Sequence, residues 1–296
     1  ECRFHFIVDK SCLKEIGTFA GWNFIGSTAG ILKDHGVNIL LNMFLGPVVN
    51  AARGISNSVN ATICLFAGNF MTALNPQIIK SFASGESAYT TSLVERGSRF
   101  SFYIVFILAL PILLETDFVL DLWLGQYPAH TVNFVRLVLL LSMCDLLSNT
   151  LVTLQQATGR IRNYQLAVGG TLLLNFPLSY FCLENSFPPE SVFIVALLIS
   201  FVCLFLRLVF LNKMVHLSIK QYLRNVCCNV FLVSLCSIVI PVMIRLQMPS
   251  GWERFVVVGG LSVLCTGISV CVVGCSSSER YFFMVKMREV QRKLFK

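Results

Sequence analysis

Residues 191–211 read SVFIVALLISFVCLFLRLVFL, and this run decides the class of fold. Its 21 residues include one charged side chain, Arg207, and neither proline nor glycine. A helix of about 20 mostly apolar residues is long enough to cross the hydrocarbon core of a bilayer. The run therefore predicts a membrane-spanning helix.

The composition extends this prediction to the whole chain. Of the 296 residues, 55% are hydrophobic and 13% are charged, whereas soluble domains carry about 25% charged residues. A single soluble core stops growing at about 250–300 residues, so a core alone does not account for this excess. The apolar side chains indicate a surface that faces lipid.

Seven further apolar segments accompany the first. The eight predicted spans cover residues 16–45, 48–79, 98–114, 132–158, 164–183, 191–211, 226–244 and 255–275. Turn-forming residues separate them: Gly46-Pro47 divides the first two, and Pro188-Pro189 precedes the sixth. The predicted fold class is an all-α integral membrane protein with about eight transmembrane helices.

The basic residues alternate between the two sides of these spans. Eighteen Lys and Arg fall in segments on one side, and two, Arg245 and Arg254, fall on the other. Cytoplasmic loops carry such an excess, which predicts that both ends are cytoplasmic and that Glu115 and Asp117 face outward. The net charge of +8 is then a matter of topology, and no nucleic-acid partner is expected. The basic tail 276–296 either lies on anionic membrane lipids or is solvated and serves topology alone.

Polar side chains recur at helical spacing on the first, second and fourth spans. The three stripes are Asn23, Ser27, Gly30, Asp34 and Asn38; Asn50, Arg53, Asn57 and Asn60; and Ser142, Asp145, Asn149 and Gln156. Lys33 lies at the edge of the first stripe, where mutual neutralisation with Asp34 is one interpretation. Polar stripes can join helices by hydrogen bonds worth roughly 0.6–2 kcal/mol each, or they can line a water-accessible cavity. Their density, with a charge in each stripe, favours a cavity for polar cargo.

Several chemical classes lack their signatures. The sequence has no P-loop, HExxH or GxSxG motif and no paired cysteine ligands. We therefore expect no enzyme activity, no cofactor and no metal. Six of the twelve cysteines, at positions 64, 144, 203, 236, 265 and 271, lie inside apolar segments, where free cysteine behaves as a small hydrophobe.

Three motifs around the second span resemble a known family. They are NILLN (38–42), FLGPVVNAARG (44–54) and NFMTALNPQI (69–78), followed later by LPILLETD (110–117), HTVNFVR (130–136) and QATGRI (156–161). Over about residues 14–225 the chain resembles the bacterial O-antigen and polysaccharide flippases. These belong to the multidrug/oligosaccharidyl-lipid/polysaccharide exporter superfamily.

The resemblance implies an architecture of two six-helix lobes around a central cationic cavity, with two extra helices. On this view residues 1–15 are a cytoplasmic linker, 16–212 the second lobe, 213–275 the extra helix pair and 276–296 a basic cytoplasmic tail. A missing N-terminal lobe would precede Glu1. A single lobe cannot enclose the cavity, so the chain alone is expected to be inactive unless it dimerises or that lobe is present.

The resemblance also implies a function. Its members flip undecaprenyl-pyrophosphate-linked oligosaccharide across the bacterial inner membrane for surface polysaccharide synthesis, by alternating access. Arg53, with Lys33, would attract the anionic headgroup, and Asp34 or Asp145 would carry a coupling proton or sodium ion. The amides expected to hydrogen-bond the sugars are Asn50, Asn57, Asn60, Asn149 and Gln156. Lys33-Asp34-His35 departs most from the family pattern.

Three rival functions remain. A multidrug/cation antiporter of the same superfamily would prefer an acidic cavity. Apart from Arg99 and Arg207, which are counted with the cytoplasmic segments, the spans here hold three basic residues and two acidic ones. A membrane polysaccharide polymerase would need a long outward loop, which the sequence lacks. A non-transporting scaffold of a polysaccharide assembly complex would leave the polar stripes unexplained.

Overall fold

The computed structural model describes residues 10–276 and 279–280. Within these ranges the chain forms helices and no strand. Seven of the described helices are long and apolar enough to cross a membrane, and the first is long enough to do so twice. The predicted all-α membrane architecture is confirmed.

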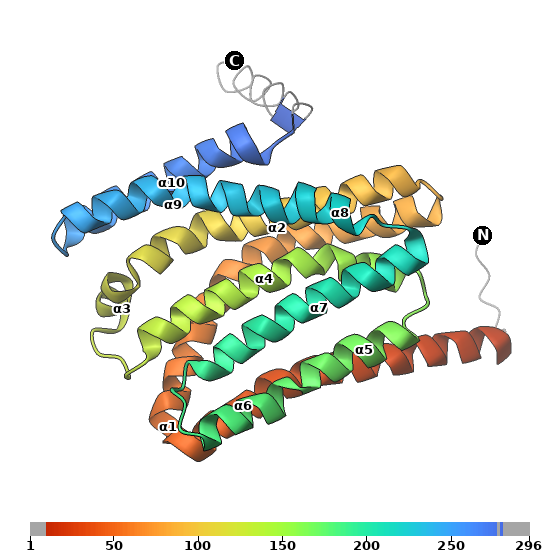
Figure 1. The fold of residues 1–296 in the computed structure, drawn as a ribbon, viewed down its shortest axis with the longest axis horizontal. Helices are drawn as coiled ribbons and strands as arrows, with labels where there is room; N and C mark the ends of the chain where they lie inside the picture. The colour runs from red at the N-terminus through yellow and green to blue at the C-terminus, as the bar shows by residue number, and fades with distance from the viewer. Residues whose placement is uncertain (1–9, 277–278, 281–296) are drawn as a thin grey trace, which may run out of the picture.

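The first helix, α1 (Lys10–Ala83), contains two of the predicted spans. Its 74 residues are interrupted at Gly46, where φ is 81° and ψ is 179°. Only glycine adopts this backbone conformation readily, and the following Pro47 has no N–H to continue the helical hydrogen bonds. The chain therefore turns back, and two limbs, residues 10–45 and 47–83, run in opposite senses (Figure 1).

The remaining helices follow with short connections (Figure 1). They are α2 (Ser87–Leu114), α3 (Thr116–Leu124), α4 (Thr131–Ala157), α5 (Arg162–Leu173), α6 (Asn175–Glu184), α7 (Ser191–Val215), α8 (Ile219–Tyr222), α9 (Asn229–Gln247) and α10 (Trp252–Ser269). Two π-helical turns, η1 (Leu223–Cys228) and η2 (Val270–Gly274), extend α9 and α10.

Three of the spans begin earlier than the sequence predicted. α2 starts at Ser87 rather than at residue 98, so Arg96 lies inside a helix and not in a loop, and Arg99 lies well within the helix rather than at its start. The last two spans begin at Ile219 and Trp252, so Lys220 also lies within a helix. The hydropathy of the sequence left these charged helical turns out of the predicted spans. In the structure, Arg96 and Arg99 are both compensated by an ion pair with Glu279.

The largest apolar cluster joins the second limb of α1 to α2, α4, α7 and α9. Small residues permit the closest approaches. A Cβ added to Gly97 would lie 2.2 Å from Leu74 and 2.8 Å from Thr150, so glycine is needed where α2 meets α1 and α4. On the first limb, a Cβ at Gly26 would lie 2.0 Å from the Gln165 side chain of α5.

The two ends of the bundle differ in charge. At the basic end α1 begins, its second limb ends, α4 passes to α5 and α7 ends (Figure 1); Lys14, Lys80, Arg160, Arg162 and Lys213 lie there. The acidic end holds α3, the start of α4 and the α6–α7 and α9–α10 connections, with Asp117, Asp121, Glu184, Glu190 and Glu253.

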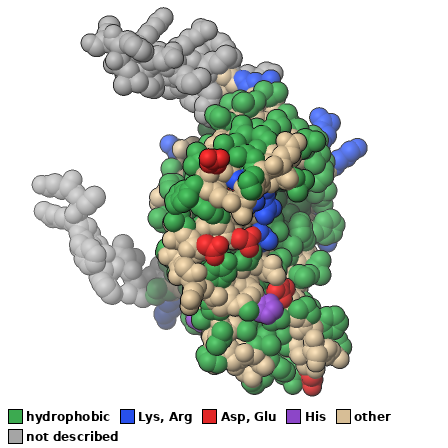
Figure 2. Space-filling model, turned by 90° about the vertical axis from the view of Figure 1, so that its left-hand side faces the viewer, with side chains coloured by type: hydrophobic (Ala, Val, Ile, Leu, Met, Phe, Trp, Pro, Cys, Tyr) green, Lys and Arg blue, Asp and Glu red, His purple; other side chains and the backbone are tan. Residues whose placement is uncertain are grey.

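The two arginines that broke the predicted alternation have carboxylate partners at the acidic end. Arg254 contacts Glu115 across 2.8 Å and Arg245 lies 3.6 Å from the same carboxylate, which is 1% exposed. Figure 2 looks onto this end and shows acidic and basic side chains side by side. The exceptions thus neutralise a buried carboxylate.

Candidate functional site

A polar cavity of about 250 Å³ lies between both limbs of α1 and helices α4, α6 and α7. Its polar lining combines members of all three predicted stripes: Lys33, Asp34, Asn38, Arg53, Asn57, Asn60, Ser142 and Asp145. Val37, Val138, Leu141, Val192, Phe193 and Ala196 complete its apolar walls, and Asn175 adds a further amide.

The turn at Gly46 explains why the first two stripes meet. Because the limbs fold back on each other, the face of the first limb that carries Asp34 and Asn38 comes beside the face of the second that carries Arg53 and Asn57. On α4, Ser142 and Asp145 are three residues apart and therefore share one face. One backbone turn and helical periodicity thus assemble the site.

Arg53 is the most unusual member of the cavity. It is 6% exposed, and its Nε and Nη1 atoms are buried without a hydrogen-bond partner among the described residues. Its guanidinium carbon lies 5.8 Å from the centroid of the Phe193 ring, a distance at which a cation is attracted to an aromatic face. A buried charged donor without an acceptor is costly, so this arrangement suits an anionic or strongly polar ligand.

Lys33 forms its ion pair with Asp145 rather than with its neighbour Asp34. The Nζ–Oδ2 distance is 3.9 Å, and the side chains are 9% and 45% exposed. The other oxygen of Asp145 accepts a hydrogen bond from the Ser200 hydroxyl of α7, while Asp34 is exposed at the cavity. The proposed mutual neutralisation of Lys33 and Asp34 is replaced by a link between α1, α4 and α7.

Other predicted residues separate into two groups. Asn57 and Asn60 line the cavity, whereas Asn50, Asn149 and Gln156 do not. Asn149 is exposed on α4, and Gln156 lies in the last turn of that helix. A stripe on one helix face is longer than the cavity, so its outer members lie beyond the walls.

Asn175 is a cavity residue that sequence reasoning missed. It is 1% exposed, and its Oδ1 atom has no hydrogen-bond partner in the described part of the chain. It stands at the junction of α5 and α6, just before Pro177, which lacks the N–H needed for a continuous helix. A lone amide next to a proline inside an apolar span was the available signal.

The cavity contains two basic residues, Lys33 and Arg53, and two acidic residues, Asp34 and Asp145. The third intramembrane cation, Arg136, lies elsewhere: it bonds to Asp117 across 2.9 Å and to Thr116 across 3.2 Å. The excess of basic residues expected from the sequence is therefore absent from the cavity lining. Charge count alone does not distinguish anionic from cationic cargo.

Among the described residues, no three His, Cys, Asp or Glu side chains are grouped to hold a metal ion. The ten described cysteines are free, and those at positions 228, 236 and 271 are exposed on the helix surface.

No protein-family model, no characterised protein and no solved structure matches this chain. Function is therefore inferred from the cavity together with the sequence motifs.

Proposed function

We propose that this chain is one lobe, with two added helices, of a transporter that flips undecaprenyl-pyrophosphate-linked oligosaccharide across the bacterial inner membrane. The observation that supports this most is the buried guanidinium of Arg53, two of whose donors have no hydrogen-bond partner among the described residues, in a cavity lined by amides. The other support is the set of flippase-like motifs, two of which contain cavity residues.

A pyrophosphate headgroup suits these donors. The planar guanidinium presents N–H groups that match phosphate oxygens in pairs, and Lys33 adds a second cation on the facing limb. The amides of Asn57, Asn60 and Asn175 can donate and accept, which suits sugar hydroxyls of varied orientation. A site with few directional constraints favours a transporter that must release its cargo.

The small size of the cavity supports the proposal that a second surface completes the site. Its volume of about 250 Å³ is below the range of about 300–1,000 Å³ typical of small-molecule pockets. Asp34 and Asn57 are exposed at its rim. We propose that an N-terminal lobe or a second copy of the chain faces this rim, and that rocking of the two lobes gives alternating access.

Ion coupling is assigned to the Lys33–Asp145 pair. Binding of a proton or a sodium ion at Asp145 would neutralise the carboxylate and release Lys33 to the cargo. Because the pair joins α1 to α4, and Ser200 joins α4 to α7, this change would reach three helices at once. Asp34 is the alternative ion ligand at the rim.

The test is made in the full-length protein in a strain that depends on it for surface polysaccharide. Arg53→Ala and Lys33→Ala are expected to reduce surface polysaccharide strongly. Arg136→Ala is the matched control, because it removes an intramembrane arginine outside the cavity. Unchanged polysaccharide in the Arg53 and Lys33 variants, at normal protein levels, would refute the headgroup role and favour a scaffold.

A multidrug/cation antiporter is the second candidate, and the balanced charge of the cavity supports it. Asp34 and Asp145 would then bind a cationic drug in exchange for a proton. A deletion strain would become drug-sensitive with normal surface polysaccharide under this alternative. Under the flippase proposal it would lose polysaccharide and keep its drug resistance.

A further inference from the structure

A second, larger groove lies at the basic end of the bundle, away from the polar cavity. Its volume is about 1240 Å³, and its walls are the first turns of α1, the α4–α5 connection and the end of α7. None of its lining residues belongs to the polar cavity. The groove and the polar cavity are therefore two distinct sites.

Four cations surround the groove, and none of its described lining residues is acidic. They are Lys14, Arg160, Arg162 and Lys213, and all four are exposed. None of them forms an ion pair with a described side chain. Elsewhere in the described chain, Arg99, Arg245 and Arg254 pair with buried carboxylates. Among the described side chains, nothing compensates the positive charge of the groove.

Aromatic rings form the apolar wall below these cations. The Arg162 guanidinium lies 5.4 Å from the Trp22 ring centroid, and Tyr164 meets Phe210 edge to face at 6.2 Å. Phe19 is on the same wall. Tryptophan and tyrosine concentrate at the level of lipid headgroups, so this combination is typical of the membrane–water interface.

A backbone feature adds to the charge. Helix α5 begins at Arg162, and its preceding residue, Ile161, has no side chain able to cap the helix. The first N–H groups of a helix, together with its dipole, favour an anion. The residues of this first turn, Arg162, Asn163 and Tyr164, line the groove.

We propose that this groove binds an anionic phospholipid of the leaflet at the basic end. The headgroup phosphate is held by Arg160, Lys213 and the first turn of α5, while the acyl chains lie against Phe19, Trp22 and Phe210. The site selects lipids of net negative charge, because the cationic group of a zwitterionic lipid would be repelled by the same four cations. It orders the meeting point of α1, α5 and α7 and is independent of the transported cargo.

The sequence offers a direct probe. Of the three tryptophans, Trp22 lines the groove, whereas Trp123 and Trp252 belong to α3 and to the start of α10 at the acidic end. The variant W123F/W252F therefore reports on the groove alone. The variant is placed in nanodiscs of unbrominated phosphatidylcholine. Two titrations follow, one with brominated phosphatidylglycerol and one with brominated phosphatidylcholine, because brominated acyl chains quench tryptophan on contact.

The expected result is selective quenching. Brominated phosphatidylglycerol should reach half-maximal quenching of Trp22 at a roughly fivefold lower mole fraction than brominated phosphatidylcholine, the factor that one cation near a membrane surface contributes. Adding Arg160→Gln and Lys213→Gln should abolish this preference. Arg162 is left in place because it stacks on the reporter.

The matched control is Lys80→Gln with Lys220→Gln, which removes two exposed cations at the same end outside the groove. It should keep the preference. Equal quenching by the two lipids, or equal loss in the control, would overturn the proposal. Displacement of brominated phosphatidylglycerol by an equimolar polyprenyl phosphate would also overturn it, because the groove would then be a site for cargo lipid.

Discussion

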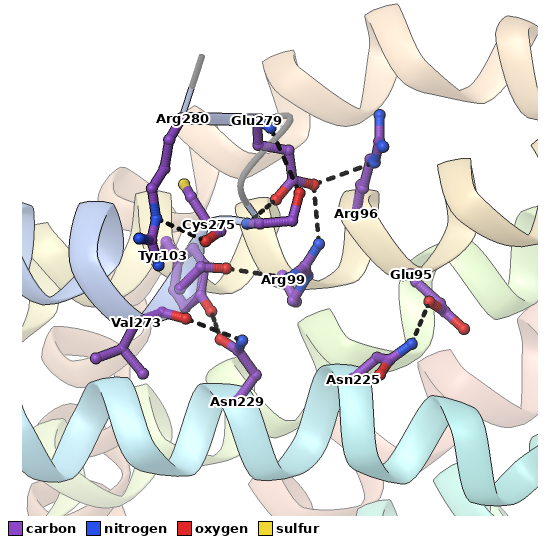
Figure 3. Close-up of polar contacts among 12 residues, drawn as sticks. Glu95, Arg96, Arg99, Tyr103, Asn225, Asn229, Val273, Cys275, Glu279 and Arg280 are labelled. Atoms are coloured by element: carbon purple, nitrogen blue, oxygen red, sulfur yellow. Dashed lines mark hydrogen bonds and ion pairs between the residues drawn. The ribbon is translucent and has the colours of Figure 1, made fainter. Parts of the chain in front are cut away.

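Arg99 in α2 donates a hydrogen bond to the Glu279 carboxylate across 2.9 Å, although the two residues are 180 positions apart in the chain. Arg99 also donates to the Gly274 carbonyl at 3.0 Å, and Arg96 approaches the same carboxylate at 3.1 Å (Figure 3). Nearby, Tyr103 donates to Asn229, and Asn229 donates to the Val273 carbonyl. This polar network attaches the C-terminal helix pair to α2.

Replacement of Glu279 by Gln is expected to destabilise the protein. Glu279 is 7% exposed, and removing one member of a buried ion pair commonly costs about 3–5 kcal/mol because the partner charge stays buried. The thermal unfolding midpoint in detergent would fall. Glu253→Gln, at an exposed glutamate with no ion pair in the described chain, is the control and should leave the midpoint unchanged. Equal midpoints for both variants would contradict the importance of the network.

Replacement of Arg53 by Met is expected to stabilise the protein while it abolishes transport. The guanidinium has two buried donors without described acceptors, and each buried unsatisfied group costs about 1–3 kcal/mol. Sites that bind ligands commonly carry such instability. The measurement is again the thermal midpoint, here without cargo.

Arg254→Met is the matched control for that experiment. It removes an arginine bonded twice to Glu115, which is 1% exposed, so it should lower the midpoint. Opposite signs for the two arginines are the expected pattern. A lower midpoint for Arg53→Met would mean that Arg53 is structural.

Replacement of Gly46 by Ala tests the turn that brings the two limbs together. At φ 81° and ψ 179° a side chain is strained, at a cost of about 1–3 kcal/mol. Gly68→Ala is the control, since its added Cβ meets nothing within 4 Å in a helix of normal geometry. That change should be neutral or stabilising by up to about 1 kcal/mol. Equal unfolding free energies for the two variants would argue against a strained turn.

The contact between the α6–α7 connection and α4 should depend on pH. Burial acts to raise the pKa of the Glu190 carboxyl, but hydrogen bonds from Asn133 and His130 outweigh it and hold this pKa below its ordinary value of 4.5. A carboxyl group whose pKa is lower in the folded state stabilises the fold at pH values above its pKa in the unfolded state. This contribution is lost as the pH falls through its pKa in the folded state. The stability difference between wild type and Glu190→Gln should therefore shrink as the pH falls below 4.5. A difference that is the same at every pH would show that Glu190 is not charged in this contact.

Much of the architecture was predictable because lipid imposes simple requirements. Continuous apolar runs located the spans, and Gly46-Pro47 marked the turn between the first two. The meeting of three polar stripes followed from helical periodicity, since each stripe had to avoid lipid. Periodicity carries no information on depth along a helix, however. It therefore grouped Asn50, Asn149 and Gln156 with residues that line the cavity.

Tertiary contacts account for what sequence reasoning missed. Arg96 and Arg99 lie within a helix, where Glu279, far along the chain, compensates their charges. Lys33 pairs with Asp145 because α1 packs against α4, which adjacent positions such as Lys33 and Asp34 do not indicate. Asn175 lies in the wall because a proline breaks its span. In each case the outcome depends on a tertiary partner that the local sequence does not identify.

The Glu115–Arg254 pair has a consequence for how the chain enters the membrane. Arg254 lies 139 positions after Glu115. The Glu115 carboxylate is therefore synthesised well before the α9–α10 hairpin that carries its cation. A chain that ended after α7 would lack both Arg245 and Arg254, the two cations that neutralise this carboxylate. The final hairpin thus supplies a charge that the earlier spans need.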